Sequence, residues 1–273
     1  MSVRVIYDDR DPAVEYFPSR WPTEGFGMPL EFDSTTSSPV KQGQSAVFRF
    51  SGSAVTVFGT LAAGNGSSMS FQIDDQDAVA YDVRAKDDTK HHQSLFTASK
   101  LSETGMHTLT MVSTGPDASQ IFLDYFLVQT SDVPASGKSI FVDDRDGRAA
   151  DIVEVSYSEG QWSVLRSEAY FGSSVHSGTP GSSLVISFQG TQLTLRGPIA
   201  IPFSGSDAAS LPYTAFASID GGALISLTPP ANFNQLPGAT MLNNLLFISP
   251  VLSPRATYRQ HHHRSGLFGA SAR

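Results

Sequence analysis

The sequence predicts an all-β protein made of two tandem jelly-roll β-sandwich domains, and three observations support this class. The 273 residues include 23 Gly and 16 Pro but only 16% charged residues, whereas an average soluble chain carries about 25%. Several short segments alternate apolar and polar residues with a period of two, and none shows an apolar stripe with helical spacing. The same ordered set of segments also occurs twice along the chain.

The internal repeat begins with an apolar strand that ends in the tetrapeptide Asp-Asp-Arg-Asp. This tetrapeptide stands at residues 8–11 and again at residues 143–146. The two tryptophans of the chain, Trp21 and Trp162, follow it in the respective copies. The identical tetrapeptide and the parallel order of the later segments indicate two homologous domains.

The later segments of the first copy each have the pattern of β-strands. Residues 46–59 alternate around a Ser-Gly-Ser turn and predict a β-hairpin, which residues 184–197 repeat without a gap. Residues 68–74 and 107–112 also alternate, and residues 121–128 form a dense apolar run. Strands spaced about ten residues apart are typical of a β-sandwich or jelly roll.

We expect a first repeat at residues 1–130, a linker at residues 131–138 and a second repeat at residues 139–254. The linker is polar and contains one Pro and one Gly, which is typical of a domain boundary. Residues 255–273 resemble neither of the last two strands of the first copy. The second domain is therefore expected to lack its closing strands and to expose residues 140–142 as an unpaired sheet edge. We interpret the last segment as a non-native tail from a truncated or frame-altered end, with which a downstream membrane span would have been lost.

Composition argues against several functions. Without cysteine the chain has no disulfide, thiolate metal site or cysteine nucleophile. A net charge of -8 without a basic block argues against binding to nucleic acids. The chain contains no apolar stretch of about 18 residues, which is the length that a membrane span requires. The N-terminus also lacks the apolar core of a secretory signal. On these signals alone a cytoplasmic location stays open.

The ordered motifs resemble those of a known group of proteins. The set comprises the Asp-Asp strand end, the tryptophan, a Phe-x-Gly hairpin, a Ser-Ile-Asp-Gly strand, and strands with His-Thr-Leu and Leu-Asp-Tyr. It is similar to the tandem β-sandwich ectodomains of basidiomycete cell-surface proteins, which in turn resemble galactose-binding-like jelly rolls and calcium-containing carbohydrate-binding modules. The resemblance covers nearly all of residues 3–130 and, less completely, residues 139–250. It implies an extracellular or cell-surface location, and it implies the fold more firmly than an activity.

The first acidic tetrapeptide is a candidate metal site. Asp8, Asp9 and Asp11 cluster oxygen ligands of the kind that Ca²⁺ prefers. The resemblance implies a structural Ca²⁺ held between the first strand and an acidic residue of the last strand, which would be Asp124. The alternative, which we favour, is a strand end followed by an Asx turn in which Arg10 neutralises its neighbours. The second copy has no counterpart of the last-strand acid, so we do not expect the same site there.

Four aromatic residues are candidate ligand contacts. Trp21 and Trp162 could stack on the apolar face of a sugar ring, and Tyr16 and Tyr157, which precede them, could take part. The alternative is that each tryptophan packs between the two sheets of its sandwich, as is usual for a single tryptophan in this fold. We favour the core position for the tryptophans.

No motif predicts catalysis. The chain lacks a nucleophile elbow, a phosphate loop and a dinucleotide fingerprint. The adjacent Asp74 and Asp75 are interpreted as a turn and not as the paired acids of a glycosidase, and the histidine pair His91-His92 lacks the spacing of a catalytic zinc site. The leading hypothesis, by analogy of fold, is a non-catalytic carbohydrate- or glycoprotein-binding protein of fungal cell-surface type, with a glycan or cell-wall polysaccharide as partner. The alternative is a structural ectodomain or spacer of a membrane protein, without a ligand of its own.

Overall fold

The computed structural model divides the chain into two compact units, Ser2–Lys138 and Ser139–Arg273. It describes residues 2–22, 31–85, 87–117, 119–132, 137–157, 161–166, 174–199, 215–227, 241–252, 258–259 and 267–272. The predicted all-β class is confirmed, because the described elements are antiparallel strands and one short 3-10 turn, η1 (Phe32–Ser34). Within these ranges, no helix has the length and apolar character that crossing a membrane requires.

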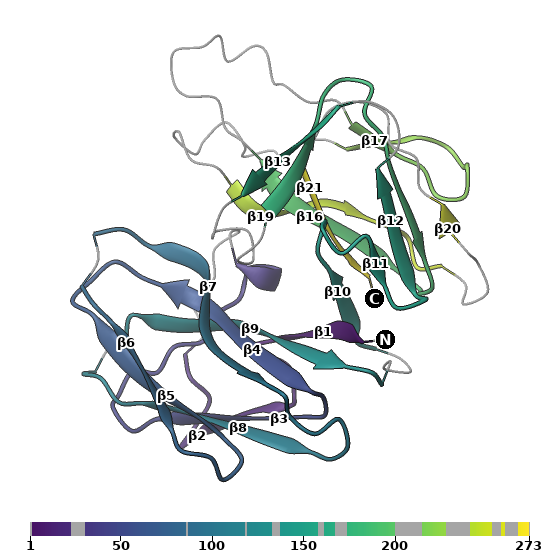
Figure 1. Cartoon of the computed structure of the whole chain (residues 1–273). Helices are drawn as coiled ribbons and strands as arrows, with labels where there is room; N and C mark the ends of the chain where they lie inside the picture. Colours follow the sequence, from purple (N-terminus) through teal and green to yellow (C-terminus); the bar gives the residue numbers. More distant parts are fainter. Residues whose placement is uncertain are drawn as a thin grey trace. The chain divides into compact units, whose positions relative to one another are not determined.

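The first unit is a sandwich of two antiparallel sheets. Its strands are β1 (Val3–Asp8), β2 (Val14–Phe17), β3 (Ser45–Phe50), β4 (Ala54–Leu61), β5 (Ser67–Ile73), β6 (Val79–Val83), β7 (Lys90–Ser99), β8 (His107–Ser113) and β9 (Ile121–Thr130). One sheet has the order β1–β9–β4–β7, and the other has the order β2–β3–β8–β5–β6. Figure 1 shows the two sheets of this unit as two facing layers.

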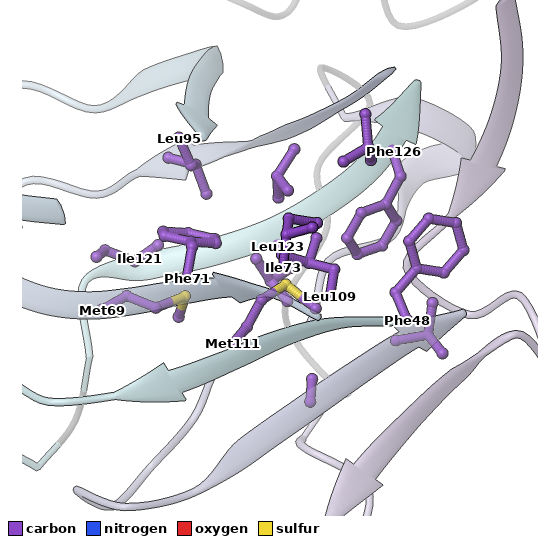
Figure 2. Packing of buried hydrophobic residues seen from close by; sticks show 14 of the residues in the cluster. Phe48, Met69, Phe71, Ile73, Leu95, Leu109, Met111, Ile121, Leu123 and Phe126 are labelled. Carbon is purple, nitrogen blue, oxygen red and sulfur yellow. The ribbon is translucent and has the colours of Figure 1, made fainter. Parts of the chain in front are cut away.

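The alternation in the sequence places the core between these layers. In β5 and β8 every second residue is buried, and Met69, Phe71 and Leu109 are each 0% exposed. Phe48 of one sheet stacks on Phe126 of the other, with ring centroids 4.5 Å apart. Figure 2 shows these side chains interleaved between the strands. Burial of each large apolar side chain stabilises the fold by roughly 1.5–3 kcal/mol, so this layer holds the two sheets together.

Steric contacts explain why two positions of the repeated hairpin motif are glycine. A Cβ on Gly52, whose φ is +152°, would lie 2.4 Å from the backbone oxygen of Gln129. A Cβ on Gly59 would lie 2.3 Å from the backbone oxygen of Phe122, where the pairing of β4 with β9 shifts register. Only glycine allows the neighbouring strand to approach so closely at these two positions.

The second unit repeats much of this strand arrangement. Its strands are β10 (Ser139–Val142), β11 (Arg148–Ala149), β12 (Val153–Tyr157), β13 (Trp162–Arg166), β14 (Ser174–Gly178), β15 (Leu184–Phe188), β16 (Leu193–Ile199), β17 (Ala215–Ala217), β18 (Ile225–Leu227), β19 (Met241–Ile248), β20 (Tyr258–Arg259) and β21 (Leu267–Ala272). One sheet contains the order β10–β21–β16–β19, with the hairpin β13–β14 joined to β21. The other has the order β11–β12–β15–β20, and β17 pairs with β18.

Strand pairing follows the same register in the two units. Tyr16 of β2 stands opposite Ala46 of β3, and Tyr157 of β12 stands opposite Leu184 of β15. Ala46 and Leu184 are the first residues of the two hairpin segments that the sequence repeat aligns. In the same way β10, β16 and β19 take the places that β1, β4 and β7 have in the first unit.

The expectation that the second domain lacks its closing strands is wrong. β21 lies between β10 and β16, as β9 lies between β1 and β4, and Val142 pairs with Ala270. β20 pairs with β15, as β8 pairs with β3. Residues 140–142 are therefore not an unpaired edge. The physical reason is that a strand ladder uses backbone groups, which residues 267–272 supply without the apolar pattern of β9. That residues 255–273 come from an altered reading frame stays a prediction.

Candidate functional site

The acidic tetrapeptide forms a tight turn after the first strand of each unit. In the first unit Asp8 accepts hydrogen bonds from the Arg10 amide through Oδ1, at 2.8 Å, and from the Asp11 amide through its carbonyl, at 3.0 Å. In the second unit Asp143 accepts the corresponding bonds from the amides of Arg145 and Asp146, at 3.1 and 3.0 Å. Both are the Asx turns that the alternative interpretation predicted.

Asp9 points inward and fastens the segment after η1 to the sheet. Its side chain is 0% exposed and accepts hydrogen bonds from the hydroxyls of Thr35, at 2.6 Å, and Ser37. The backbone pairs Ser37 with Leu123 of β9 at the same place. A buried carboxyl group is tolerated because these hydroxyls replace the water that it loses.

The Thr35 hydroxyl lies between two carboxyl groups. Its oxygen is 2.9 Å from Asp8 Oδ2 and 2.6 Å from Asp9 Oδ1, but its single proton serves one acceptor at a time. Burial, and then the charge of Asp9, raise the pKa of Asp8 to about 7. Burial also raises the pKa of Asp9. The pair therefore retains a proton well above the pH at which a free carboxyl group loses it.

A bulge in β7 turns two histidines toward acidic partners. The register with β4 shifts at this point, and His92 has a φ of +52°, which is uncommon for a residue with a side chain. His91 Nδ1 lies 2.6 Å from Glu31 Oε1, and His92 Nδ1 lies 3.5 Å from Asp124 Oδ2. Thr60 of β4 donates its hydroxyl to Glu31, at 2.7–2.8 Å.

The carboxyl groups of Glu31 and Asp124 take different protonation states. Burial, and then the negative charge of Glu31, raise the pKa of Asp124 well above its usual value. Burial also acts to raise the pKa of Glu31, but the hydrogen bond and charge of His91 outweigh it and lower that pKa. Asp124 Oδ1 accepts the Phe32 amide, at 2.9 Å. Since the side chains of Glu31 and Asp124 are 3% and 0% exposed, this group serves to anchor η1 to the sheet.

The four carboxylates predicted as a calcium site do not share one centre. Asp8 and Asp9 converge on Thr35, whereas Asp124 binds the amide of the buried Phe32. Asp11 contacts Lys138, with Oδ2 2.8 Å from Nζ. In the described part of the chain, no three His, Asp or Glu side chains are grouped as a metal ion requires. As placed, these carboxyl groups do not surround one point with the six to eight oxygen ligands that Ca²⁺ takes, and the calcium site stays a prediction.

The predicted aromatic contacts differ in exposure. Trp21 is 1% exposed and belongs to the core of the first sandwich, which is the position that we favoured from the sequence. It cannot stack on a sugar from this position. Tyr16 is half-buried, and its ring lies 5.1 Å from that of Trp21. In the second unit Trp162 and Tyr157 are both half-buried, with ring centroids 4.9 Å apart.

The second unit adds a histidine to its aromatic pair. His176 of β14 stacks on Tyr157 with ring centroids 4.3 Å apart, and its Nδ1 lies 2.6 Å from Asp144 Oδ2. Burial is the largest cause that raises the pKa of Asp144. The hydrogen bond to His176 lowers this pKa and the charge of Asp143 raises it further, so that it reaches about 6. Trp162 completes the cluster, with its ring centroid 6.5 Å from that of His176. Its role as a sugar contact stays a prediction.

A pocket of about 370 Å³ opens beside β2 of the first unit, and we call it the β2 pocket. It contains Tyr16 and Asp11, two of the predicted site residues, together with two arginines that were not predicted as contacts. Its lining is Arg10, Asp11, Pro12, Val14, Tyr16 and Arg20. The volume is within the range of small-molecule sites, about 300–1,000 Å³.

Sequence reasoning missed several of these residues for different reasons. Glu31 and Arg20 carry no motif that marks them, and His176 aligns with no histidine of the first copy. The doublet His91-His92 was visible, but its acidic partners, Glu31 and Asp124, lie far from it in the chain. Arg10 was assigned only a neutralising role, since nothing in the sequence shows that it reaches the pocket of Tyr16.

Comparisons with known proteins identify no family. No protein-family model matches the chain, and no curated protein matches it. Among solved structures, a family two carbohydrate esterase from Cellvibrio japonicus is similar at 15% identity and a TM-score of 0.33, over 50% of this chain and 37% of that one. A Paenibacillus xanthan lyase is similar at 13% identity and a TM-score of 0.28, over 99% and 25% of the two chains.

A β-glucuronidase from Bacteroides uniformis has 10% identity and a TM-score of 0.25, with 97% of this chain and 28% of that chain covered. The present chain thus spans between a quarter and two fifths of the length of these three proteins. Because the similarity to these structures is so low, the site of the first unit is interpreted from its own residues alone.

Proposed function

We propose that this chain is a non-catalytic carbohydrate- or glycoprotein-binding protein and that its first unit contacts the ligand at the β2 pocket. The observation that supports this is the lining of the pocket, where Tyr16 presents a half-buried ring beside Arg10, Arg20 and Asp11. Small-molecule sites commonly place a few polar groups around an apolar surface, and the tyrosine ring and charged groups of this pocket follow that pattern. The extracellular or fungal cell-surface setting that the sequence resemblance implies belongs to the same proposal.

Binding would depend on hydrogen bonds and one aromatic surface, without a chemical step. The Arg10 and Arg20 guanidinium groups carry donors and the Asp11 carboxylate carries acceptors, so together they can satisfy both kinds of sugar hydroxyl contact. The acid–histidine group around Glu31 and Asp124 is buried and engaged in holding η1. This supports a non-catalytic role, since neither carboxylate is placed to reach a substrate.

A glycan array probed with the intact chain tests the proposal. We expect binding above background to at least one class of saccharide, and we expect Tyr16→Ala to reduce it more than Tyr81→Ala. Tyr81 is a suitable control because it lies on β6, outside the pocket lining, and is also partly buried. Absence of binding to every glycan, with both units folded by circular dichroism, would refute the proposal.

The second candidate is a structural ectodomain or spacer without a ligand. One observation favours it, namely that the most conspicuous motif residues of the first unit serve the fold. Trp21 and Asp124 are buried, and Asp9 anchors the segment after η1. The same array distinguishes the two functions, because a spacer gives no signal with any glycan.

A further inference from the structure

We propose that the β2 pocket selects saccharides that carry a carboxylate over neutral ones. This inference rests on the proposed carbohydrate-binding function and names the class of ligand at the same site. It comes from the charges around the pocket, which differ in sign from the charge of the chain as a whole. The chain carries a formal charge of -8, whereas the pocket lining contains Arg10 and Arg20 against the single acid Asp11.

The acids nearest to the pocket are already engaged by other groups. Asp11 Oδ2 lies 2.8 Å from Lys138 Nζ, and its Oδ1 accepts the Ala13 amide at 2.9 Å. Asp8 Oδ1 accepts the Arg10 amide, and Asp9 is buried under the hydroxyls of Thr35 and Ser37. The one acid that lines the pocket thus has its charge balanced by a lysine.

The two arginines keep their guanidinium groups available. Both side chains are exposed, and neither forms an ion pair or a side-chain hydrogen bond with any described residue. By contrast, Arg49 on β3 lies 2.6 Å from Glu15, and Arg148 lies 2.7 Å from Asp151. Within the described part of the chain, the arginines of the pocket therefore differ from these exposed arginines in forming no ion pair with an acid, although the charge of Arg10 acts on the buried Asp9.

Guanidinium groups recognise carboxylates with a specific geometry. Two parallel N–H groups of one arginine match the two oxygens of a carboxylate, which gives stronger and more directional contacts than a neutral hydroxyl can. The ring of Tyr16, fixed by its hydroxyl bond to the Asp9 carbonyl at 2.7 Å, provides an apolar surface beside these charges. A uronic-acid unit combines a carboxylate with an apolar ring face, and it fits this set of groups.

Isothermal titration of the full chain tests the inference with three pairs of probes. The acidic probes are oligogalacturonate, oligomannuronate and a hyaluronan oligosaccharide, and each is compared with its carboxyl-reduced, neutral form. We expect at least one acidic probe to bind about tenfold or more tightly than its neutral partner, and we expect this preference to weaken at 1 M salt, where charges are screened within about 3 Å. Neutral forms that bind as tightly as the acidic ones would overturn the inference while leaving the proposed function intact. Absence of binding to all six probes and to a neutral glycan array would overturn both.

Three variants connect the preference to the pocket. Arg20→Ala and Arg10→Ala should each remove most of the preference, and Arg20→Lys should restore only part of it, because lysine keeps the charge but not the paired donors. Arg84→Ala is the matched control, since Arg84 is exposed, changes the net charge equally and lies outside the lining. Equal losses in Arg84→Ala and Arg20→Ala would show that bulk charge acts and would overturn the assignment to the pocket. Melting temperatures of all variants establish that they are folded.

Discussion

Tyr16 donates a hydrogen bond from its hydroxyl to the backbone carbonyl oxygen of Asp9, at a distance of 2.7 Å. Tyr157 and Asp144 form the same contact in the second unit, at 2.9 Å. The bond joins β2 to the turn after β1 in the first unit, and it joins β12 to the turn after β10 in the second. The two units thus share a side-chain contact as well as a strand order, and Tyr16 combines this structural role with a place in the β2 pocket.

The first prediction concerns this bond. Tyr16→Phe should lower the free energy of unfolding of the first unit by about 1–2 kcal/mol, because a partly buried carbonyl loses its donor while the ring stays in place. Urea unfolding, followed by the fluorescence of Trp21 in a Trp162→Phe background, measures the change. Tyr81→Phe is the control, since no described partner accepts a hydrogen bond from its hydroxyl. Equal losses in the two variants would contradict a specific role for the Tyr16 hydroxyl.

The second prediction separates the two tryptophans. Iodide should quench the fluorescence of Trp21 much less than that of Trp162, because Trp21 is 1% exposed and Trp162 is only half-buried. Single-tryptophan proteins, Trp162→Phe and Trp21→Phe, report each residue alone. Replacement of Trp21 by alanine should also cost about 3–5 kcal/mol of stability, as expected for a large side chain in a core. Equal quenching of the two residues would show that Trp21 is accessible to solvent, and Trp21 would again be a candidate sugar contact.

Local patterns predicted those parts of the fold that depend on neighbours in the sequence. The strand around Phe71 was predictable because its side chains alternate between core and solvent. The turn at Asp8 was predictable because an Asx turn is formed within four residues. The burial of Trp21 was favoured on the general behaviour of this fold.

Features that depend on distant residues were not predictable in the same way. The closing strand β21 was missed because Ala270 and its neighbours offer backbone pairing without an apolar alternation. The calcium hypothesis treated Asp8 and Asp124 as ligands, whereas hydroxyl and amide groups from the segment at Phe32–Ser37 bind them. The β2 pocket depends on how one turn directs Arg10 toward Tyr16, which the order of residues does not reveal.

The third prediction is a pH dependence caused by Asp8. Its pKa rises from 3.8 to about 7, through burial first and then through the charges of Asp9 and Asp33, while bonds from Arg10 and Thr35 act in the opposite direction. Between these two values the folded unit holds a proton that the unfolded chain releases. The stability of the unit therefore falls as the pH rises through this window, with a slope of up to about 1.4 kcal/mol per pH unit for one proton.

Asp8→Asn removes this titration, so its unfolding free energy relative to wild type should increase from pH 4 to pH 8. Urea denaturation at several pH values gives the difference directly, and the comparison cancels the titration of groups that do not interact with Asp8, which leaves Asp9 as the coupled group. Asp75→Asn serves as the control because Asp75 lies in an exposed turn. A difference between Asp8→Asn and wild type that stays constant with pH would show that Asp8 does not retain a proton.

The fourth prediction tests the closing strand of the second unit. A chain that ends at residue 254 lacks β20 and β21, and it leaves the backbone groups of β10 and β16 without the partner between them. We expect this truncation to lower the unfolding temperature of the second unit and to promote association through the open edge. Ala270→Pro in the full chain should act in the same direction, because proline removes a ladder donor in a strand that is paired on both sides.

Calorimetry and light scattering measure the two effects, and the transition of the first unit serves as an internal reference. Ala223→Pro provides a matched control within the second unit, since Ala223 lies between β17 and β18 and is exposed. Unchanged melting of the second unit in both the truncated chain and Ala270→Pro would mean that residues 267–272 do not close the sheet. The segment would then be a tail that the second sandwich does not need, and β10 would be the unpaired edge that the sequence predicts.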